Sequence, residues 1–244
     1  MREHQNLYKN GGNCALWGNV MSLLVLARHG EHEYNAQGLA CGTAEAHLTD
    51  KGRQEARDLG ARCKESCLVF DVATTSPLVR CVETMQGFEE AYGNVPRHET
   101  IIRAQEHDYG RLEGKNVKEV LDLPTWTVDD VYRLQQDSKQ PLREFLVEPW
   151  SNVCRRGMFS AEAMRELAAD SHQGGQHNII HFGHGLLNSV IAHYILYPEA
   201  MIPDPMMRPY HAGTGQYHSF EMNGAGRVVR WKSAKGTEWV ELAE

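Results

Sequence analysis

The sequence predicts an α/β fold with three layers, α/β/α, around a largely parallel central sheet and with a helical lid inserted in the middle. Short apolar runs, typical of strands that are buried on both faces, alternate with segments in which apolar residues recur every three or four positions. The chain has 244 residues, a length that fits one domain of this class or two small ones. Its 41% hydrophobic and 23% charged residues exclude disordered, collagen-like and coiled-coil chains.

Two strand–helix units are predicted in the first half of the chain. Apolar runs at 23–27 and 69–74 predict buried strands. After the first run, Thr49 is suited to cap a helix whose inner face would hold Ala56, Leu59, Cys63 and Cys67. After the second, Ser76 and Pro77 predict a cap and the first position of a helix. The inner face of that helix would hold Leu78, Cys81, Met85, Phe88 and Tyr92.

The second half continues the pattern and ends in strands. Ser160 is predicted to cap a helix whose inner face would hold Ala161, Met164, Leu167 and Ala168. The run 178–182 predicts a third buried strand, and the apolar segment directly after it predicts a helix. Strands are expected at 217–222, 228–231 and 239–242, with a turn between the first two.

One domain accounts for most of the chain. Residues 1–20 are expected to be a loose N-terminal extension, and 21–244 a single domain. The segment at about 113–158 is polar, contains helical fragments and has no strong strand pattern. We therefore assign it to the lid, or specificity insertion.

Charge and cysteine content limit the partners that the chain can bind. The formal net charge of −7 gives no general attraction to nucleic acid or to anionic membranes, so neither is expected as a partner. The six cysteines show no zinc or haem spacing, and Cys63 and Cys67, four residues apart, lack a second ligand pair. Reduced thiols, no metal, no cofactor and a cytoplasmic location are therefore predicted.

Three predicted strand ends bear residues suited to an anion. The first strand runs into Arg28 and His29, the second leads to Arg80, and the third runs into His184 and Gly185. In open α/β sheets, ligands bind beyond the carboxyl ends of the strands. Two arginines and two histidines that meet there would match the oxygens of a phosphate. Gly185, at a helix start, would let backbone N–H groups approach the same anion.

The motifs around these residues resemble those of the histidine phosphatase superfamily, in its phosphoglycerate mutase-like branch. The matching segments span residues 23 to 190 and read LLVLARHGEHEYNAQG, HLTDKGRQEA, TTSPLVRCVET, EHDYGRLEG and IIHFGHG. The resemblance implies that His29 is a nucleophile that forms a phosphohistidine and that Glu106 is the proton donor. It also implies that Arg28, Arg80 and His184 hold the phosphate, to which a protonated His184 would contribute charge.

Further residues are candidates for substrate binding. Asn35 could donate to a phosphate oxygen from the first loop, and Tyr109 could line the pocket. The part of the substrate beyond the phosphate could be bound by Arg111, Arg155 and Arg156. Asp108 and Glu113 lie near Glu106 and are the alternative proton donors.

Departures from the family pattern favour hydrolysis over mutase activity. His32 stands where many phosphatases have a hydroxyl residue, and the arginine pair Arg155–Arg156 lacks the flanking prolines typical of mutases. A metal-independent phosphomonoesterase that acts on a small phosphorylated substrate is therefore expected. A phosphoglycerate mutase-like phosphotransferase and a phosphate-binding or scaffolding module remain the alternatives. The expected partner is a small-molecule phosphate monoester, and a homodimer stays open beside a monomer.

Overall fold

A computed structural model describes residues 22–116, 147–169, 176–200, 212–224, 226–236 and 238–242. Its strands form one seven-stranded sheet in the order β3-β2-β4-β1-β5-β6-β7. They are β1 (Ser22–Arg28), β2 (Val72–Thr75), β3 (Arg97–Thr100), β4 (Ile179–Gly183), β5 (Tyr217–Met222), β6 (Val228–Lys232) and β7 (Val240–Glu241). The helices are α1 (Glu33–Gln37), α2 (Asp50–Glu65), α3 (Val79–Tyr92), α7 (Trp150–Ala168) and α8 (Gly185–Leu196). Short 3-10 turns cover Ile102–Ala104 and Gly110–Leu112.

The centre of the sheet is parallel and one side of it is antiparallel. Strands β3, β2, β4 and β1 run in the same direction, whereas β5, β6 and β7 each run opposite to the strand before them in the sheet. The register places Arg28, the last residue of β1, beside Gly183, the last residue of β4. The two segments that follow these strands therefore leave the sheet side by side.

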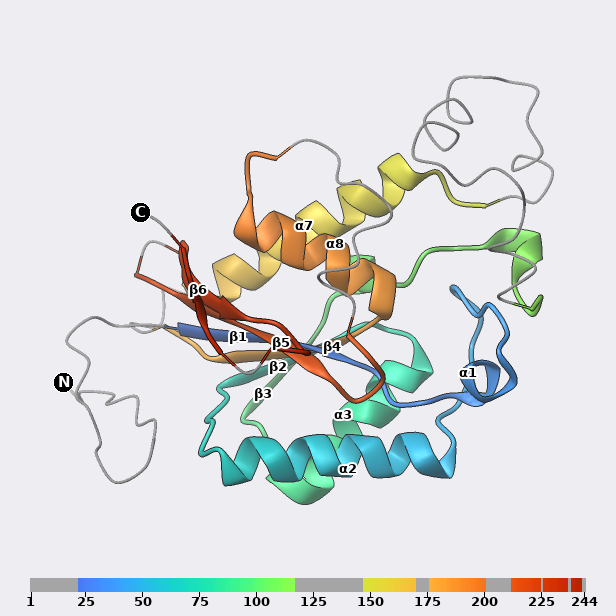
Figure 1. Ribbon diagram of the computed structural model, residues 1–244, viewed down its shortest axis with the longest axis horizontal. Coiled ribbons are helices and arrows are strands. Elements are labelled where there is room, and N and C mark those ends of the chain that lie inside the picture. The colour runs from blue at the N-terminus through green and yellow to red at the C-terminus, as the bar shows by residue number, and fades with distance from the viewer. Residues whose placement is uncertain are drawn as a thin grey trace.

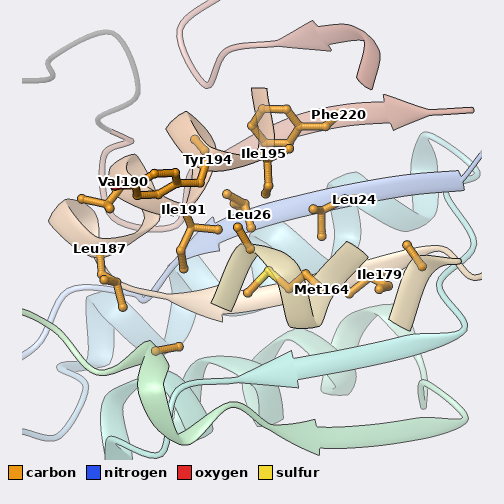
Figure 2. Close-up of a cluster of buried hydrophobic side chains, with 14 of the residues drawn as sticks. Leu24, Leu26, Met164, Ile179, Leu187, Val190, Ile191, Tyr194, Ile195 and Phe220 are labelled. Atoms are coloured by element: carbon orange, nitrogen blue, oxygen red, sulfur yellow. The ribbon is translucent and has the colours of Figure 1, made fainter. Parts of the chain in front are cut away.

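Helices cover both faces of the sheet, which gives the three layers that the sequence predicts (Figure 1). Alternate residues of β1 point to opposite faces, as the geometry of a strand requires. Leu24 and Leu26 pack beneath α7 and α8 with Met164, Ile191 and other apolar residues (Figure 2). On the other face, Leu23, Val25 and Ala27 belong to a core that includes Leu59 of α2 and Phe88 of α3.

Most predicted elements are present, and two predicted helix starts are wrong. The Thr49 hydroxyl caps α2 by accepting from the backbone N–H of Gly52. Helix α3, however, begins at Val79 rather than at Pro77, and the Ser76 hydroxyl lies within hydrogen-bond distance of both the Leu78 N–H and the His184 ring. Helix α7 begins at Trp150, ten residues before the predicted cap, and the Ser160 hydroxyl donates to the carbonyl oxygen of Arg156 within that helix.

The predicted lid lies largely outside the described residues, which omit 117–146. Residues 150–158, the last part of the predicted insertion, lie in α7, where Trp150, Val153 and Cys154 belong to the core beneath α8. The lid therefore stays a prediction, and α7 is part of the core rather than of a separate insertion. The predicted extension 1–20 also lies outside the described residues. No described helix has both the length and the apolar character needed to cross a membrane.

Candidate active site

The predicted site residues gather where β1 and β4 end. His29 follows β1, and its backbone N–H donates to the carbonyl oxygen of Gly183, the last residue of β4. His184 comes next in the chain and precedes α8, and its ring centroid lies 5.4 Å from that of His29. The parallel register therefore brings together two histidines that are 155 positions apart in the sequence.

The hydrogen bonds of His29 determine which ring nitrogen can react. Its Nδ1 lies 2.8 Å from the carbonyl oxygen of Gly30, and a carbonyl oxygen only accepts, so Nδ1 carries the proton. Burial, Arg28 and Arg80 hold the pKa of His29 well below its ordinary value. The imidazole is therefore neutral at pH 7, with an unshared electron pair on Nε2.

Two glycines allow α2 to approach the segment that bears His29. A Cβ atom on Gly30 would collide with the backbone carbonyl of Gly52, and one on Gly52 would collide with the carbonyl oxygen of Glu31. The N–H of Gly30 donates to the Thr84 hydroxyl of α3 at 3.1 Å. The backbone beside His29 is thus held by both helices on this face of the sheet.

Arg28 and Arg80 supply the positive charge of the site. Arg28, at the end of β1, donates from Nη1 to the carbonyl oxygen of Ala212 at 3.0 Å. Arg80, in the first turn of α3, is 1% exposed and donates to the carbonyl oxygens of Ala44 and Gly42 at 2.9 and 2.6 Å. Its buried Nε–H finds no acceptor among the described residues. A buried guanidinium with an unused donor suits a phosphate oxygen.

His184 lies at the site. In the absence of a bound anion it is neutral, which contradicts the prediction that it adds a positive charge. Burial, followed by the charge of Arg80, holds its pKa well below the ordinary value. Its Nε2 lies 2.8 Å from the Ser76 hydroxyl and 3.4 Å from the Cys81 thiol. The neutral ring is therefore held by two hydrogen-bonding side chains that the sequence analysis did not identify as part of the site.

Glu106 binds the start of α8. Its Oε2 accepts from the N–H of Leu186, and its Oε1 accepts from the N–H groups of Leu187 and His107, at 3.1, 3.1 and 2.9 Å. A carboxylate has about four acceptor positions, so the remaining one lies on Oε2. The charges of Glu106 and Arg28 also act on each other, which places this carboxylate near Arg28.

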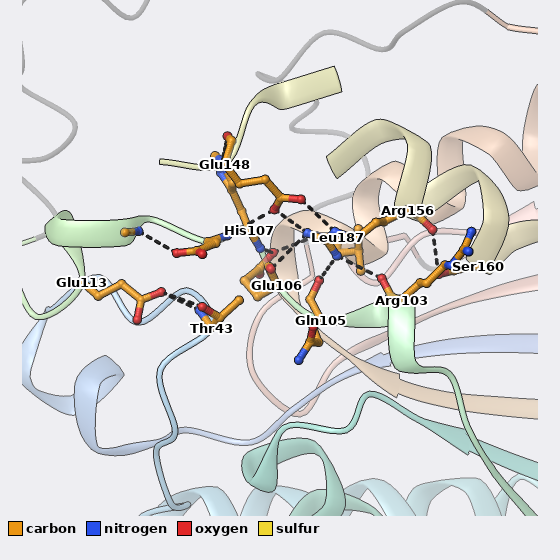
Figure 3. A network of polar contacts seen from close by, with 12 residues as sticks. Thr43, Arg103, Gln105, Glu106, His107, Glu113, Glu148, Arg156, Ser160 and Leu187 are labelled. Atoms are coloured by element: carbon orange, nitrogen blue, oxygen red, sulfur yellow. Dashed lines mark hydrogen bonds and ion pairs between the residues drawn. The ribbon is translucent and has the colours of Figure 1, made fainter. Parts of the chain in front are cut away.

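Arg156 holds the segment before Glu106 rather than standing free for a substrate (Figure 3). Its guanidinium donates to the carbonyl oxygens of Arg103, Gln105 and Glu106 at 2.9, 2.5 and 3.2 Å. It also makes two bonds to the Glu148 carboxylate, at 2.9 and 2.6 Å. These contacts contradict the prediction that Arg156 contacts the substrate, because the N–H groups of its guanidinium already donate to other acceptors.

The other predicted substrate-binding residues have different surroundings. Tyr109 is partly buried, and burial and the charge of Glu106 raise the pKa of its hydroxyl. The backbone N–H of Asn35 and the Nδ1 atom of His32 form one half of a capping box, and the Asn35 side chain closes the other half. Gly185 is buried as the first residue of α8. Arg111 and Arg155 are exposed.

The alternative proton donors have other partners. Asp108 accepts from the backbone N–H of Gly110 at 2.7 Å. One oxygen of Glu113 accepts from both the N–H and the hydroxyl of Thr43, at 2.6 and 3.2 Å. Glu106 is therefore the carboxylate of the three that bonds to the helix start beside His184.

Comparison with known proteins identifies the family and the fold. The family model described as "Histidine phosphatase superfamily (branch 1)" matches residues 24–233. A 2,3-bisphosphoglycerate-dependent phosphoglycerate mutase from Streptococcus pyogenes (serotype M5, strain Manfredo) is 42% identical over 104 residues, which are 42% of this chain and 45% of the mutase. The chain thus matches less than half the length of that relative.

Solved structures with the same fold include a mutase and a phosphatase. The phosphoglycerate mutase of Bacillus anthracis is 18% identical, with a TM-score of 0.64 over 86% of this chain and 91% of its own. A mycobacterial glucosyl-3-phosphoglycerate phosphatase, solved with VO3, is 20% identical, with a TM-score of 0.63 over 86% of this chain and 96% of its own. At these identities the likeness shows the fold alone.

Proposed function

The chain belongs to the histidine phosphatase superfamily, and we propose that it hydrolyses a small phosphate monoester through a phosphohistidine on His29, without a metal ion. The observation that carries this proposal is the bond from Nδ1 of His29 to the carbonyl oxygen of Gly30. It leaves the electron pair of Nε2 unshared in a buried site that also holds Arg28 and Arg80. A protein that only binds phosphate has no need for such a nucleophile.

In the first step, Nε2 of His29 attacks the phosphorus atom and the ester P–O bond breaks. Arg28 and Arg80 offset the negative charge of the phosphoryl oxygens, the task that metal ions perform in other phosphoryl-transfer enzymes. The leaving alkoxide takes the proton from the remaining position on Oε2 of Glu106. The products of this step are the free alcohol, the phosphohistidine and an ionised Glu106.

In the second step, water attacks the phosphohistidine. Glu106 takes a proton from the water as its oxygen bonds to phosphorus, and the N–P bond breaks. Inorganic phosphate leaves, Nε2 regains its electron pair, and Glu106 is again protonated. Water is the one co-reactant.

Mutase activity is the second candidate, because the curated relatives that match are named phosphoglycerate mutases. A mutase must hold a small acid that carries a second anionic group. Among the described residues, the arginine pair offers little for this purpose, since Arg155 is exposed and Arg156 is bonded to Glu148 and backbone carbonyls. This arrangement supports hydrolysis.

One set of assays distinguishes these candidates. The purified protein is incubated with nitrophenyl phosphate and a panel of sugar phosphates, nucleotides and phosphoamino acids, and free phosphate is measured. A sample quenched during turnover is tested for phosphate that is labile to acid and stable to base. A separate sample receives 3-phosphoglycerate with 2,3-bisphosphoglycerate, where interconversion without release of phosphate would indicate a mutase. If the protein neither turns over these substrates nor forms phosphohistidine, the result favours a binding module.

A further inference from the structure

His32 lies beside the nucleophile, and the reaction described above gives it no role. It is 2% exposed, and its ring centroid lies 4.9 Å from that of His29. Its backbone is fixed by a bridge to Leu48. The position of this side chain is therefore set by the fold before any ligand arrives.

The cap of α1 determines the tautomer of His32. The backbone N–H of Asn35 donates to Nδ1 of His32 at 3.3 Å, so Nδ1 carries no proton. Burial, followed by the charges of Arg80 and Arg28, lowers the pKa of His32 to about 3. The ring is therefore neutral at pH 7, and its one proton is on Nε2.

Asn35 is the hydrogen-bond partner of both Nδ1 and the backbone N–H of His32. Within the part of the chain that the structure describes, the Nε2–H group of His32 has no acceptor. The charges with the largest effects on the ring are those of Arg80 and Arg28, the groups that would hold a phosphate, and the opposing effect of Glu31 is smaller. A fixed donor that lies beside His29 and is subject to the charges of two guanidinium groups suits an oxygen of a bound anion.

We infer that His32 is a further phosphate-binding residue, whose Nε2–H donates a hydrogen bond to an oxygen of the phosphoryl group held by Arg28 and Arg80. This inference rests on the proposed function for the identity of the ligand. It assigns the imidazole two tasks, one for each ring nitrogen: Nδ1 caps α1 and Nε2 binds phosphate. The cap orients the donor, because it holds both the ring and its tautomer.

Two substitutions separate these tasks. In His32→Asn, the side-chain oxygen replaces Nδ1 as the cap, and no group remains at the position of Nε2. In His32→Gln, an amide nitrogen reaches the position of Nε2, and the cap is lost. Titration calorimetry with inorganic phosphate gives the dissociation constant, and thermal unfolding gives the stability of each variant.

We expect His32→Asn to keep the wild-type Tm and to bind phosphate about tenfold to a hundredfold more weakly, the usual effect of losing a hydrogen bond to a charged group. His32→Gln should recover part of this affinity at a lower Tm. The matched control is Gly38→Ala, which strains the other end of α1, where Gly38 has a φ of 69° and open space around its Cα. It should lower the Tm and leave phosphate affinity unchanged.

Wild-type affinity in His32→Asn would overturn the inference and leave His32 as a cap alone. If that variant does not fold, nitrogen-15 NMR of the wild-type histidines decides the matter: added phosphate should shift the Nε2–H proton of His32, and an unmoved signal overturns the inference. The proposed function fails separately, since a protein that binds phosphate through His32 but forms no phosphohistidine is not this hydrolase.

Discussion

Arg156 and Glu148 form an ion pair through two hydrogen bonds, of 2.9 and 2.6 Å, at the point where α7 meets the segment that leads to Glu106. The backbone of Glu148 accepts from the His107 ring at 2.8 Å, and Arg156 bonds to the carbonyl oxygens of Gln105 and Glu106. The pair thus holds the backbone on both sides of the proposed proton donor. We expect it to act on the proposed reaction through the position of Glu106.

Arg156→Lys should therefore lower kcat for alkyl phosphates by about 10- to 100-fold, because a lysine cannot reproduce the planar set of donors and Glu106 would be misplaced. The rate with nitrophenyl phosphate, whose leaving group needs little protonation, should fall much less. Steady-state kinetics with both substrates measures the contrast. Arg155→Lys, on the exposed neighbour, is the control and should behave as wild type. Equal losses with both substrates would show that Arg156 stabilises the fold without positioning Glu106.

His29→Ala should abolish turnover and the base-stable phosphate while leaving the fold intact. Loss of a covalent nucleophile commonly lowers kcat by several powers of ten, up to about 10⁶-fold. Circular dichroism and thermal unfolding check the fold, and phosphate release checks the rate. A variant that kept more than a few per cent of the wild-type rate would contradict the phosphohistidine scheme.

Residues that follow apolar strands were the easiest to predict from the sequence. The runs that form β1 and β4 are long enough to identify, and parallel strands must bring His29 and His184 to one edge of the sheet. Strand β3, in contrast, alternates partly buried and exposed polar residues, so no apolar pattern marked it. Helix α1 has five residues, too few to show a helical period.

The partners of the site residues were harder to predict, because contacts between distant segments leave no local pattern. Arg156 lies 50 residues after the backbone that it binds, so an unpaired arginine and a substrate-binding arginine look alike in the sequence. Ser76 before a proline is typical of a helix cap, and only the fold shows that it bonds to His184, 108 positions away. The neutrality of His184 follows from burial, which its motif does not encode.

Chelation should leave activity unchanged, since Arg28 and Arg80 would offset the charge that metal ions offset elsewhere. Vanadate should inhibit, because it adopts the five-coordinate geometry of a phosphoryl group in transfer. The measurement compares phosphate release before and after treatment with EDTA and removal of the chelator. Full loss of activity with EDTA, restored by Mg²⁺ or Zn²⁺, would refute metal independence.

Stability should fall as the pH is lowered below about 6.5, because buried histidines bind protons in the unfolded chain and not in the folded one. His181 shows this most simply: burial alone lowers its pKa from 6.5 to about 3. The contribution of neutral His181 to the free energy of unfolding is complete above pH 6.5. It is lost as the pH falls toward 3, at about 1.4 kcal/mol per pH unit.

Urea unfolding of the wild type and of His181→Asn at several values between pH 6.5 and 4.5 tests this dependence. Asparagine keeps an acceptor for the Thr74 hydroxyl, which lies 2.9 Å from Nδ1 of His181, but does not titrate. The free energy of unfolding should depend less steeply on pH in the variant, because about one proton fewer is taken up on unfolding. Identical slopes would mean that His181 is protonated in the folded state.

Glu106→Gln should lower activity in proportion to how strongly the leaving group needs a proton. An alkyl phosphate leaves as a basic alkoxide, for which a positioned acid contributes about 10²- to 10⁴-fold, whereas nitrophenolate leaves with little help. Because the same carboxylate is proposed to serve as base in the second step, steady-state rates would understate the difference between alkyl and nitrophenyl phosphates. The amplitude and rate of the first turnover, measured by rapid quench, isolate the first step.

The glutamine variant keeps one side-chain oxygen, which can accept from the N–H of Leu187, whereas its amide nitrogen would face the N–H of Leu186 and lose that bond. We expect the remaining bond to keep the site assembled. Wild-type affinity for inorganic phosphate in Glu106→Gln would verify this. With phosphate binding intact, equal first-turnover losses for alkyl and nitrophenyl substrates would show that Glu106 orients the substrate without protonating it. Asp108 and Glu113 would then be tested as proton donors, although both carboxylates already accept hydrogen bonds, from Gly110 and Thr43.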